Sequence, residues 1–368
     1  MSISTPLFKV FMADSVETVM KRTLYSGYVA EGENVSRLTQ EVSKFIGNPN
    51  TVLLNSCTSA LTVAFRLAGV GPGTEVISTP LTCIASNVPI LELGGIPVWA
   101  DSDPDTGMLN PEDIEHLINE RTKAICVLHK EGDPARLDEI LSIARKYNIK
   151  VVEDCAHAFG AKYKGVKIGN HGDYACFSFQ AIKHMTTGDG GALVCKSSED
   201  FACAKRLKWF GVDRENPEGG NPWLRDVREW GYKFNMNDIA GAIGIENIKH
   251  TERLNECFHR NGVLFTNLLK NIPGVKLVKR DLKNDYLIFW AYCIIVENRK
   301  SLIDKLAAEG IASGQIHPRN DVYSIFSMSK RHLPNVDFFS ERELSLPCGW
   351  WVSEDEVGRI CDIIRRGW

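Results

Sequence analysis

The chain has 368 residues, of which 44% are apolar and 24% charged, a composition typical of globular proteins. Its length predicts one large and one smaller domain. The formal net charge of −3 and the lack of Lys/Arg-rich tracts argue against binding to nucleic acids or anionic membranes. No apolar run reaches the ~20 residues that span a bilayer, and residues 1–15 lack a signal-peptide pattern, so we expect a cytoplasmic protein.

Short β-rich runs alternate with amphipathic segments from about residue 50 to residue 200. We expect strands at TVLLNS, EVISTP, IPVWAD, AICVLHK, KVVEDCA, ACFSFQ and GALVCK. Helices are expected between several of them, as in RLDEILSIARKYN and in PEDIEHLINER, where Pro111 can begin a helix. This alternation predicts parallel crossovers and a layered α/β fold.

The pattern changes after a long helix expected over WGYKFNMNDIAGAIGIENIKH. An apolar run YLIFWAYCIIVE, a helix at SLIDKLAAEG and a last helix at SEDEVGRICDIIRRGW predict an α+β C-terminal domain. We therefore expect a large domain over residues 1–247 and a small domain over residues 248–368.

Eleven cysteines are scattered singly, without a C-x-x-C pair. Most lie in apolar, strand-like runs, where a free thiol behaves as a small buried hydrophobe. The sequence therefore predicts reduced thiols, and neither a disulfide framework nor a metal site.

Polar residues follow several of the expected strands, at the sheet edge where α/β proteins bind ligands. Cys57 and Thr58 begin an apolar helix whose N-terminus suits a phosphate, although taken alone a simple helix cap is the commoner explanation. Asp154 ends the KVVED run, and His157 follows it. A carboxylate there can pair with a protonated ring nitrogen, or serve as a cap or salt-bridge partner. Ser178 is a second candidate for phosphate binding.

Lys183 and His184 form a basic pair before the turn TTGDGG. A lysine beside an anion site and a carboxylate in a partly dry cleft has a lowered pKa and can attack a carbonyl to form a Schiff base. A phosphate site, a carboxylate and such a lysine are together what pyridoxal phosphate requires. GDGG matches neither G-x-G-x-x-G nor a P-loop, and we expect a tight turn there.

The chain resembles the DegT/DnrJ/EryC1/StrS family of sugar aminotransferases, which depend on pyridoxal 5'-phosphate. Matching segments run in order along nearly the whole chain: SGYVAEGENV, NSCTSAL, GPGTEVI, DPDTGMLNPEDI, VVEDCAHAFGAKYKG, FSFQAIKHMTTGDGG and GYKFNMNDIAGAIG. The resemblance implies the aspartate aminotransferase fold (fold type I), with a mixed, mostly parallel seven-stranded sheet flanked by helices and a smaller α+β domain.

The resemblance also implies a role for each matching residue. Lys183 matches the catalytic lysine that binds the cofactor and then moves the substrate proton, and Asp154 matches the carboxylate that pairs with the pyridine nitrogen. Further cofactor contacts are implied for Cys57, Thr58, Cys83, His157 and Ser178. Cys83 stands where many relatives place an aromatic residue against the pyridoxal ring. GYKFNMND matches a segment that reaches the partner's cofactor phosphate across a homodimer interface, through Lys233 or Asn235.

For the substrate, the resemblance implies contacts from Tyr28, His184, His317, Arg319 and Asn320, although Arg319 fits a surface arginine equally well. The implied reaction moves an amino group from L-glutamate, through pyridoxamine 5'-phosphate, to a nucleotide-linked keto-deoxysugar for polysaccharide (lipopolysaccharide, O-antigen) or glycan biosynthesis. A 4-keto-6-deoxyhexose is the first choice and a 3-keto sugar the second. A sugar 3-dehydratase would carry histidine in place of Lys183, and a non-catalytic regulator would have lost Lys183 or Asp154.

Overall fold

Seven strands form one mixed sheet in the computed structural model, which describes residues 3–215 and 220–368. Their bounds, in the order of the sheet, are β1 Thr51–Leu54, β9 Gly191–Cys195, β8 Tyr174–Ser178, β5 Lys150–Asp154, β4 Thr122–Leu128, β2 Glu75–Ser78 and β3 Ile96–Trp99. Strand β9 is antiparallel to both of its neighbours, and the remaining pairs are parallel. All seven predicted strands are present, and the predicted fold class is confirmed.

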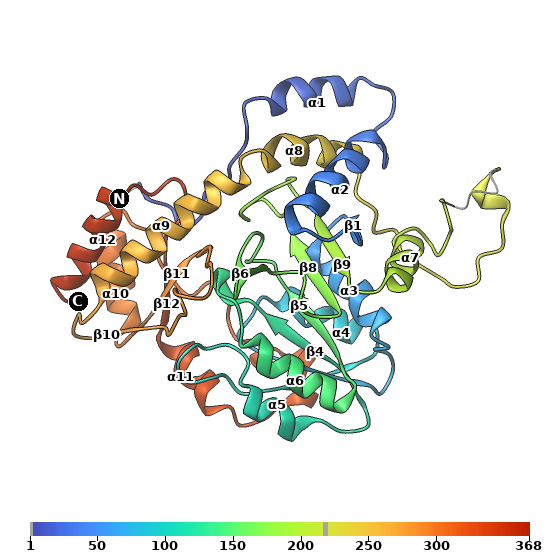
Figure 1. The fold of residues 1–368 in the computed structure, drawn as a ribbon. Coiled ribbons are helices and arrows are strands. Elements are labelled where there is room, and N and C mark those ends of the chain that lie inside the picture. Colours follow the sequence, from blue (N-terminus) through green and yellow to red (C-terminus); the bar gives the residue numbers. More distant parts are fainter. Residues whose placement is uncertain (1–2, 216–219) are drawn as a thin grey trace.

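Helices cover both faces of this sheet (Figure 1). The helices up to residue 248 are α1 Val16–Leu24, α2 Glu33–Ile46, α3 Cys57–Leu67, α4 Val88–Glu92, α5 Pro111–Leu117, α6 Leu137–Tyr147, α7 Ser198–Leu207 and α8 Asp238–Ile248. Because successive strand residues point to opposite faces, β5 contributes Val151 to the core under α2, α6 and α8, and Val152 to the core under α3 and α7. A short hairpin of β6 Lys162–Tyr163 and β7 Val166–Lys167 follows β5.

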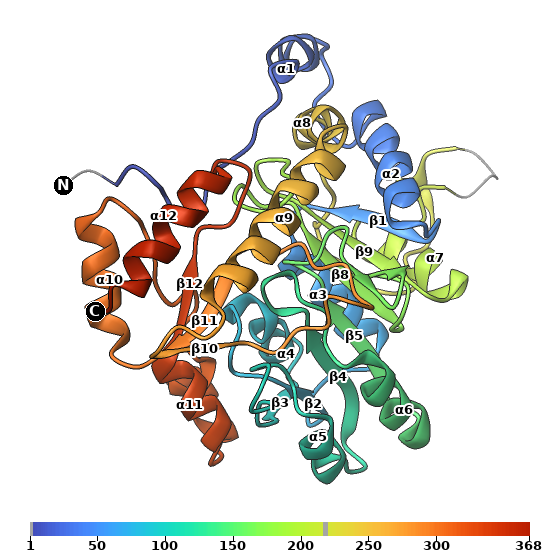
Figure 2. The same ribbon diagram turned by 60° about the vertical axis from the view of Figure 1, so that its left-hand side comes forward.

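The C-terminal part builds a separate apolar core on a three-stranded antiparallel sheet of order β10-β11-β12. Its elements are α9 Thr251–Leu269, β10 Val275–Leu277, β11 Tyr292–Val296, α10 Arg299–Ala308, α11 Pro334–Arg342, β12 Glu343–Leu346 and α12 Glu354–Arg365. Figure 2 shows α9 running from α8 toward this sheet. The division between residues 247 and 248 stays a prediction, and it falls at the end of α8.

The long helix expected over residues 230–250 is wrong in its first part, because α8 begins only at Asp238. The Asn237 side chain accepts a hydrogen bond from the Ala240 N–H and so caps the helix. Before it, the chain is extended: the Asn55 N–H donates to the Phe234 carbonyl, and Lys233 forms an isolated bridge with Trp209. Hydrogen bonds with β1 and with the segment after α7 therefore outweigh the helical pattern.

All eleven cysteines carry free thiols, as predicted. Among the residues that the structure describes, no helix is long and apolar enough to cross a membrane. His129, Glu153 and Cys155 lie close enough together to suggest a metal site. However, His129 Nδ1 accepts a hydrogen bond from the Ala135 N–H, and Nε2 lies 3.0 Å from Glu153 Oε2. The proton of the His129 ring therefore lies on Nε2 and points at the Glu153 carboxylate. Neither ring nitrogen has a free lone pair, which a metal ion would need.

Candidate active site

A cavity of about 430 Å³ lies at the carboxyl ends of β4, β5 and β8, where the ligand of an open α/β sheet is expected. Leu128, Asp154 and Ser178 are the last residues of these strands, and all three line it. The N-terminus of α3 forms another wall. Of the residues proposed from the sequence, the cavity contains Cys57, Thr58, Cys83, Asp154, His157, Ser178, Lys183 and His317.

Lys183 is the one lysine or arginine among the described residues that line this cavity. Its Nζ makes no hydrogen bond or ion pair with any residue in the described part of the chain, and it lies 3.7 Å from the centroid of the Trp290 ring. Burial lowers the pKa of Lys183 to about 8, although Asp154, Cys57 and Cys83 act in the opposite direction. About one tenth of its amine is therefore uncharged at pH 7, far more than for an ordinary lysine, and the uncharged amine is the form that acts as a nucleophile or a base.

Asp154 is held by hydrogen bonds on both carboxylate oxygens. Ser86 Oγ donates to Oδ2 at 2.6 Å, and the Ala156 N–H donates to Oδ1 at 3.1 Å. The Thr82 and Ser86 hydroxyls are 2.7 Å apart, which fixes Ser86 in turn. This buried, oriented carboxylate faces the same cavity as Lys183.

The N-terminus of α3 fits a phosphate group. Ser56 caps the helix by accepting a hydrogen bond from the Ser59 N–H. The Cys57 and Thr58 N–H groups, at the first two helical positions, have no acceptor among the described residues. A Cβ atom on Gly191 would lie 2.5 Å from Cys57 N, so only glycine lets β9 approach this closely. The geometry therefore supplies free donors and a positive helix end for an anion.

An aromatic wall closes the side of the cavity next to the C-terminal part. His157 stacks on Trp290 with centroids 4.0 Å apart and an interplanar angle of 9°, and Phe8 stacks on Trp290 at 4.4 Å. Burial and the charge of Lys183 hold the pKa of His157 well below its usual value. Its Nδ1 accepts a hydrogen bond from the Glu131 N–H, so Nε2 carries the proton of the neutral ring. The same two causes lower the pKa of His317 to about 4.

The structure does not bring His184, Arg319 or Asn320 to the cavity, although substrate contacts were expected from all three. His184 is buried, and its Nε2 lies 2.9 Å from the Ile288 carbonyl oxygen. Burial lowers its pKa to about 4. Arg319 is paired with Asp321 and Asp337. These side chains therefore hold the fold together around the cavity rather than line it.

Asn320 is also buried, and its amide donates to the Thr82 carbonyl and accepts from Asn87 Nδ2, which braces the loop that carries Cys83 and Ser86.

The residues expected to act at a subunit interface lie outside the cavity of their own chain. Lys233 Nζ lies 2.8 Å from Asn235 Oδ1 and 3.4 Å from the Trp209 ring centroid. Tyr28, for which a substrate contact was expected, also lies outside this cavity: it is 53% exposed, and its hydroxyl donates to the Glu31 carbonyl.

The sequence reasoning missed Phe8, Ser86 and Trp290, which all take part in the cavity. The signal for Ser86 was a polar residue within the expected loop after EVISTP. Trp290 was hidden in the apolar run YLIFWAYCIIVE, of which only Tyr292–Val296 forms a strand. No local signal marks Phe8, which is distant from the other cavity residues in the sequence.

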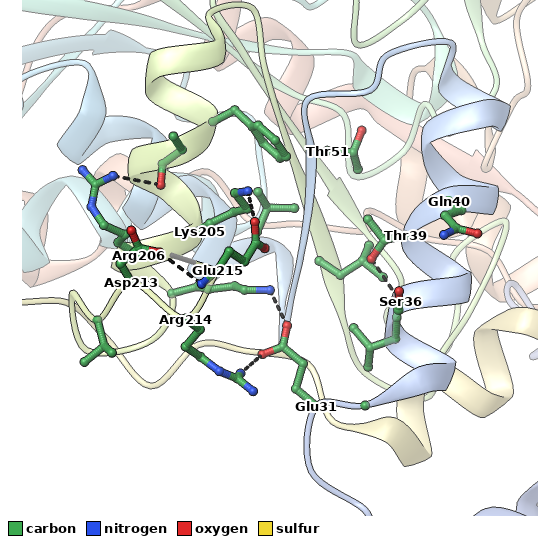
Figure 3. A pocket seen from close by; sticks show the side chains of 18 residues that line it. Glu31, Ser36, Thr39, Gln40, Thr51, Lys205, Arg206, Asp213, Arg214 and Glu215 are labelled. Carbon is green, nitrogen blue, oxygen red and sulfur yellow. Dashed lines mark hydrogen bonds and ion pairs between the residues drawn. The ribbon is translucent and has the colours of Figure 1, made fainter. Parts of the chain in front are cut away.

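A larger hollow of about 730 Å³, here called the surface groove, lies between α2, β1, α7 and the segment after α7 (Figure 3). Its cations are all paired. Glu31 binds both Lys208 and Arg214, the latter at 2.9 Å, and Lys205 binds Glu215. Arg206, the remaining cation, pairs with Glu229 at 2.9 Å. None of the residues proposed from the sequence lines this groove.

Comparison with known proteins identifies the family. The model of the DegT/DnrJ/EryC1/StrS aminotransferase family matches residues 12–365. The spore coat polysaccharide biosynthesis protein SpsC of Bacillus subtilis is 30% identical over 358 residues, covering 93% of this chain and 92% of SpsC. The crystal structure of the sugar aminotransferase CalS13 from Micromonospora echinospora superimposes with a TM-score of 0.94 at 34% identity, covering 99% of this chain and 100% of CalS13.

Spr1654 of Streptococcus pneumoniae, solved in forms with pyridoxal phosphate and with pyridoxamine phosphate, is also similar. Its pyridoxal phosphate form has a TM-score of 0.88 at 26% identity and covers 98% of this chain and 97% of its own. The family match, these relatives and a cavity suited to the cofactor agree. The chain belongs to the DegT/DnrJ/EryC1/StrS aminotransferase family and is a pyridoxal-phosphate-dependent aminotransferase.

Proposed function

We propose that this enzyme transfers the amino group of L-glutamate to a nucleotide-linked keto-deoxysugar, with a 4-keto-6-deoxyhexose as the preferred acceptor. The observation that carries the proposal is the unpaired Lys183 amine, with its lowered pKa, in one cavity with Asp154 and a free helix N-terminus. Similarity to SpsC and CalS13 supports a sugar acceptor and a polysaccharide or glycan product. The free thiols support a cytoplasmic setting.

Each cavity residue has a proposed task. When bound, pyridoxal phosphate supplies an electron-withdrawing ring that stabilises the charge left when a proton leaves the substrate carbon. We propose that Lys183 Nζ takes up that proton and later returns it to the substrate. Its pKa of about 8 suits both steps. Asp154, fixed by Ser86, keeps a proton on the pyridine nitrogen. The first N–H groups of α3 and the Ser178 hydroxyl would hold the phosphate, and His157 would keep its Nε2–H available as a donor to the ring's phenolic oxygen.

We propose further that the active enzyme is a homodimer whose sites are completed by Lys233 or Asn235 of the partner chain. Exposed large apolar side chains occur in two segments of the chain, and a subunit interface would bury such surface. Leu24, the last residue of α1, is 50% exposed, and Tyr25, which follows it, is 84% exposed. Leu224 and Trp230 are 85% and 64% exposed. Mixing two variant proteins tests this point, one carrying Lys183→Ala and the other carrying Lys233→Ala and Asn235→Ala. The mixture should regain part of the activity, because each mixed dimer contains one site with Lys183 from one chain and Lys233 and Asn235 from the other.

The sugar 3-dehydratase alternative is less well supported. It requires a histidine at the position that faces the cofactor, whereas His184 is buried against the Ile288 carbonyl and Lys183 lines the cavity. A 3-keto sugar remains the second candidate acceptor, and a regulator without catalysis is disfavoured by the retained Lys183 and Asp154.

The decisive experiment incubates the purified enzyme, which we expect to be yellow, with L-glutamate and each of a set of UDP-, dTDP- and GDP-linked 4-keto and 3-keto sugars. We expect an aminated sugar nucleotide and 2-oxoglutarate in equal amounts from one nucleotide class with a 4-keto group. Borohydride should attach the cofactor covalently to Lys183, as peptide mass spectrometry would establish. Amination of none of these sugars, in an enzyme that is trapped at Lys183, would contradict the proposed acceptor.

A further inference from the structure

Trp290 contacts Lys183 more closely than any other aromatic side chain of the described residues. The Lys183 ammonium lies 3.7 Å from the centroid of the Trp290 ring, within the distance over which a cation is attracted to an aromatic face. The Trp290 Nε1–H donates at 2.8 Å to the carbonyl of Ile182, the residue before Lys183. One side chain therefore holds both the amine of Lys183 and the backbone beside it.

Trp290 is itself fixed from several directions. Two rings from distant parts of the chain stack on it, Phe8 with centroids 4.4 Å apart and His157 with centroids 4.0 Å apart. Its backbone N–H donates to the Glu131 carbonyl at 2.8 Å. Because these contacts leave the indole few alternative rotamers, its face is in place before any cofactor binds.

The backbone is bent to bring Trp290 to the cavity. Phe289 has φ +29°, an unfavourable value for a side chain with a Cβ atom. Two glycines make this bend fit: a Cβ on Gly132 would lie 2.9 Å from Phe289 N, and one on Gly262 would lie 2.2 Å from the Phe289 ring. Backbone strain of this kind persists where surrounding contacts enforce it, and it is concentrated at functional sites.

We propose that Trp290 is a positioning residue for Lys183, whose ring receives the lysine ammonium whenever that lysine is not joined to the cofactor. The inference rests on the proposed function of Lys183. Transamination needs the lysine in two places, joined to pyridoxal phosphate at rest and free while pyridoxamine phosphate is present. A free ammonium in a partly buried cavity needs a partner, and the Trp290 ring is the contact that the described residues offer it.

The proposal predicts a difference between the two cofactor forms. Joining Lys183 to pyridoxal phosphate forms a bond between Nζ and the aldehyde carbon and releases water and the ammonium proton, so the contact with Trp290 is lost. Binding of pyridoxamine phosphate leaves the ammonium free, and the contact stays. Removing the ring should therefore raise the ratio of the dissociation constant of pyridoxamine phosphate to that of pyridoxal phosphate by roughly two- to thirtyfold.

The experiment measures both dissociation constants by fluorescence titration of the apoenzyme of the wild type and of Trp290→Leu. Packing losses common to both cofactors cancel in the ratio. Trp290→Phe keeps an aromatic face, and Phe8→Leu removes a stacking ring that makes no contact with Lys183; both should leave the ratio within twofold of the wild type. If Trp290→Leu does not fold, Trp290→Met fills more of the space and still lacks a ring.

An unchanged ratio in Trp290→Leu or Trp290→Met overturns the inference. Borohydride trapping separates this failure from a failure of the proposed function. If the cofactor is trapped on Lys183 and the ratio does not change, only the function of Trp290 is wrong. If no cofactor is trapped on Lys183, the proposed function of Lys183 is wrong, and the inference falls with it.

Discussion

The cavity that holds Lys183 and the surface groove are two hollows of the molecule that carry lysines, and they treat those lysines in opposite ways. In the groove, which is the larger, every lining lysine and arginine is paired with a carboxylate. In the cavity, Lys183 is without an ion pair, and its pKa is lowered to about 8. Paired surface charges contribute about 0–1 kcal/mol each, whereas an unpaired, partly buried charge costs stability. Of these two hollows, the smaller one holds the unpaired lysine, so charge pairing and not volume distinguishes the proposed site from the groove.

The largest expected effect comes from removing the unpaired lysine. Lys183→Ala should lower kcat by about 10⁴-fold, because no other described side chain of the cavity provides an amine to move the proton. The holoenzyme should also lose borohydride trapping. Steady-state amination assays measure the first effect and peptide mapping the second. Residual activity within tenfold of the wild type would contradict the assignment of Lys183.

Asp154→Asn should have the next largest effect, a loss of roughly 10²-fold in kcat. The amide keeps the shape of the carboxylate and the hydrogen bond with Ser86, but it lacks the negative charge that holds a proton on the pyridine nitrogen. Ser86→Ala is the matched control, since it removes only the bond to Asp154 Oδ2 and should cost about tenfold or less. Equal losses in the two variants would mean that orientation, and not charge, is what Asp154 provides.

Gly191→Ala tests the phosphate site. The new Cβ would lie 2.5 Å from Cys57 N, so the N-terminus of α3 must shift, and the affinity for pyridoxal phosphate should fall more than about tenfold. Gly71→Ala is the control, because a Cβ there meets no atom within 4 Å. Titration of each apoenzyme with the cofactor gives the dissociation constants. Wild-type affinity in Gly191→Ala would place the phosphate elsewhere.

The pH dependence of cofactor attachment tests the lowered pKa of Lys183 directly. The neutral amine is the nucleophile, so the attachment rate of the apoenzyme should rise about tenfold from pH 7 to a plateau, with a midpoint near 8. Burial is the main cause of this shift and Asp154 opposes it. Asp154→Asn should therefore move the midpoint to lower pH. A rate that still rises above pH 10 would mean that Lys183 keeps an ordinary pKa.

The sequence predicted the parts of the cavity that follow from strand ends. Asp154 and Ser178 end parallel strands, and a polar residue at that position must face the ligand edge of the sheet. The alternation of strand and helix likewise predicted all seven strands of the sheet.

The parts that depend on distant contacts could not be predicted. Trp290 reaches the cavity only because the backbone bends at Phe289 against two glycines from other segments. His184 adjoins Lys183 in the chain but points to the Ile288 carbonyl, which no local pattern reveals. The helix expected from residue 230 is replaced by extended chain because β1 offers it hydrogen bonds.

The smallest expected effect belongs to the surface groove. Lys205 is paired with Glu215, and their side chains are 29% and 64% exposed, so water screens the pair. Lys205→Ala should change the free energy of unfolding by less than about 1 kcal/mol and kcat by less than twofold. Denaturant titration and the amination assay measure the two quantities. A loss of kcat comparable to that of Lys183→Ala, with the fold intact, would show that a paired lysine in an open groove can be essential. The pairing of charges would then no longer distinguish the proposed catalytic cavity from the groove.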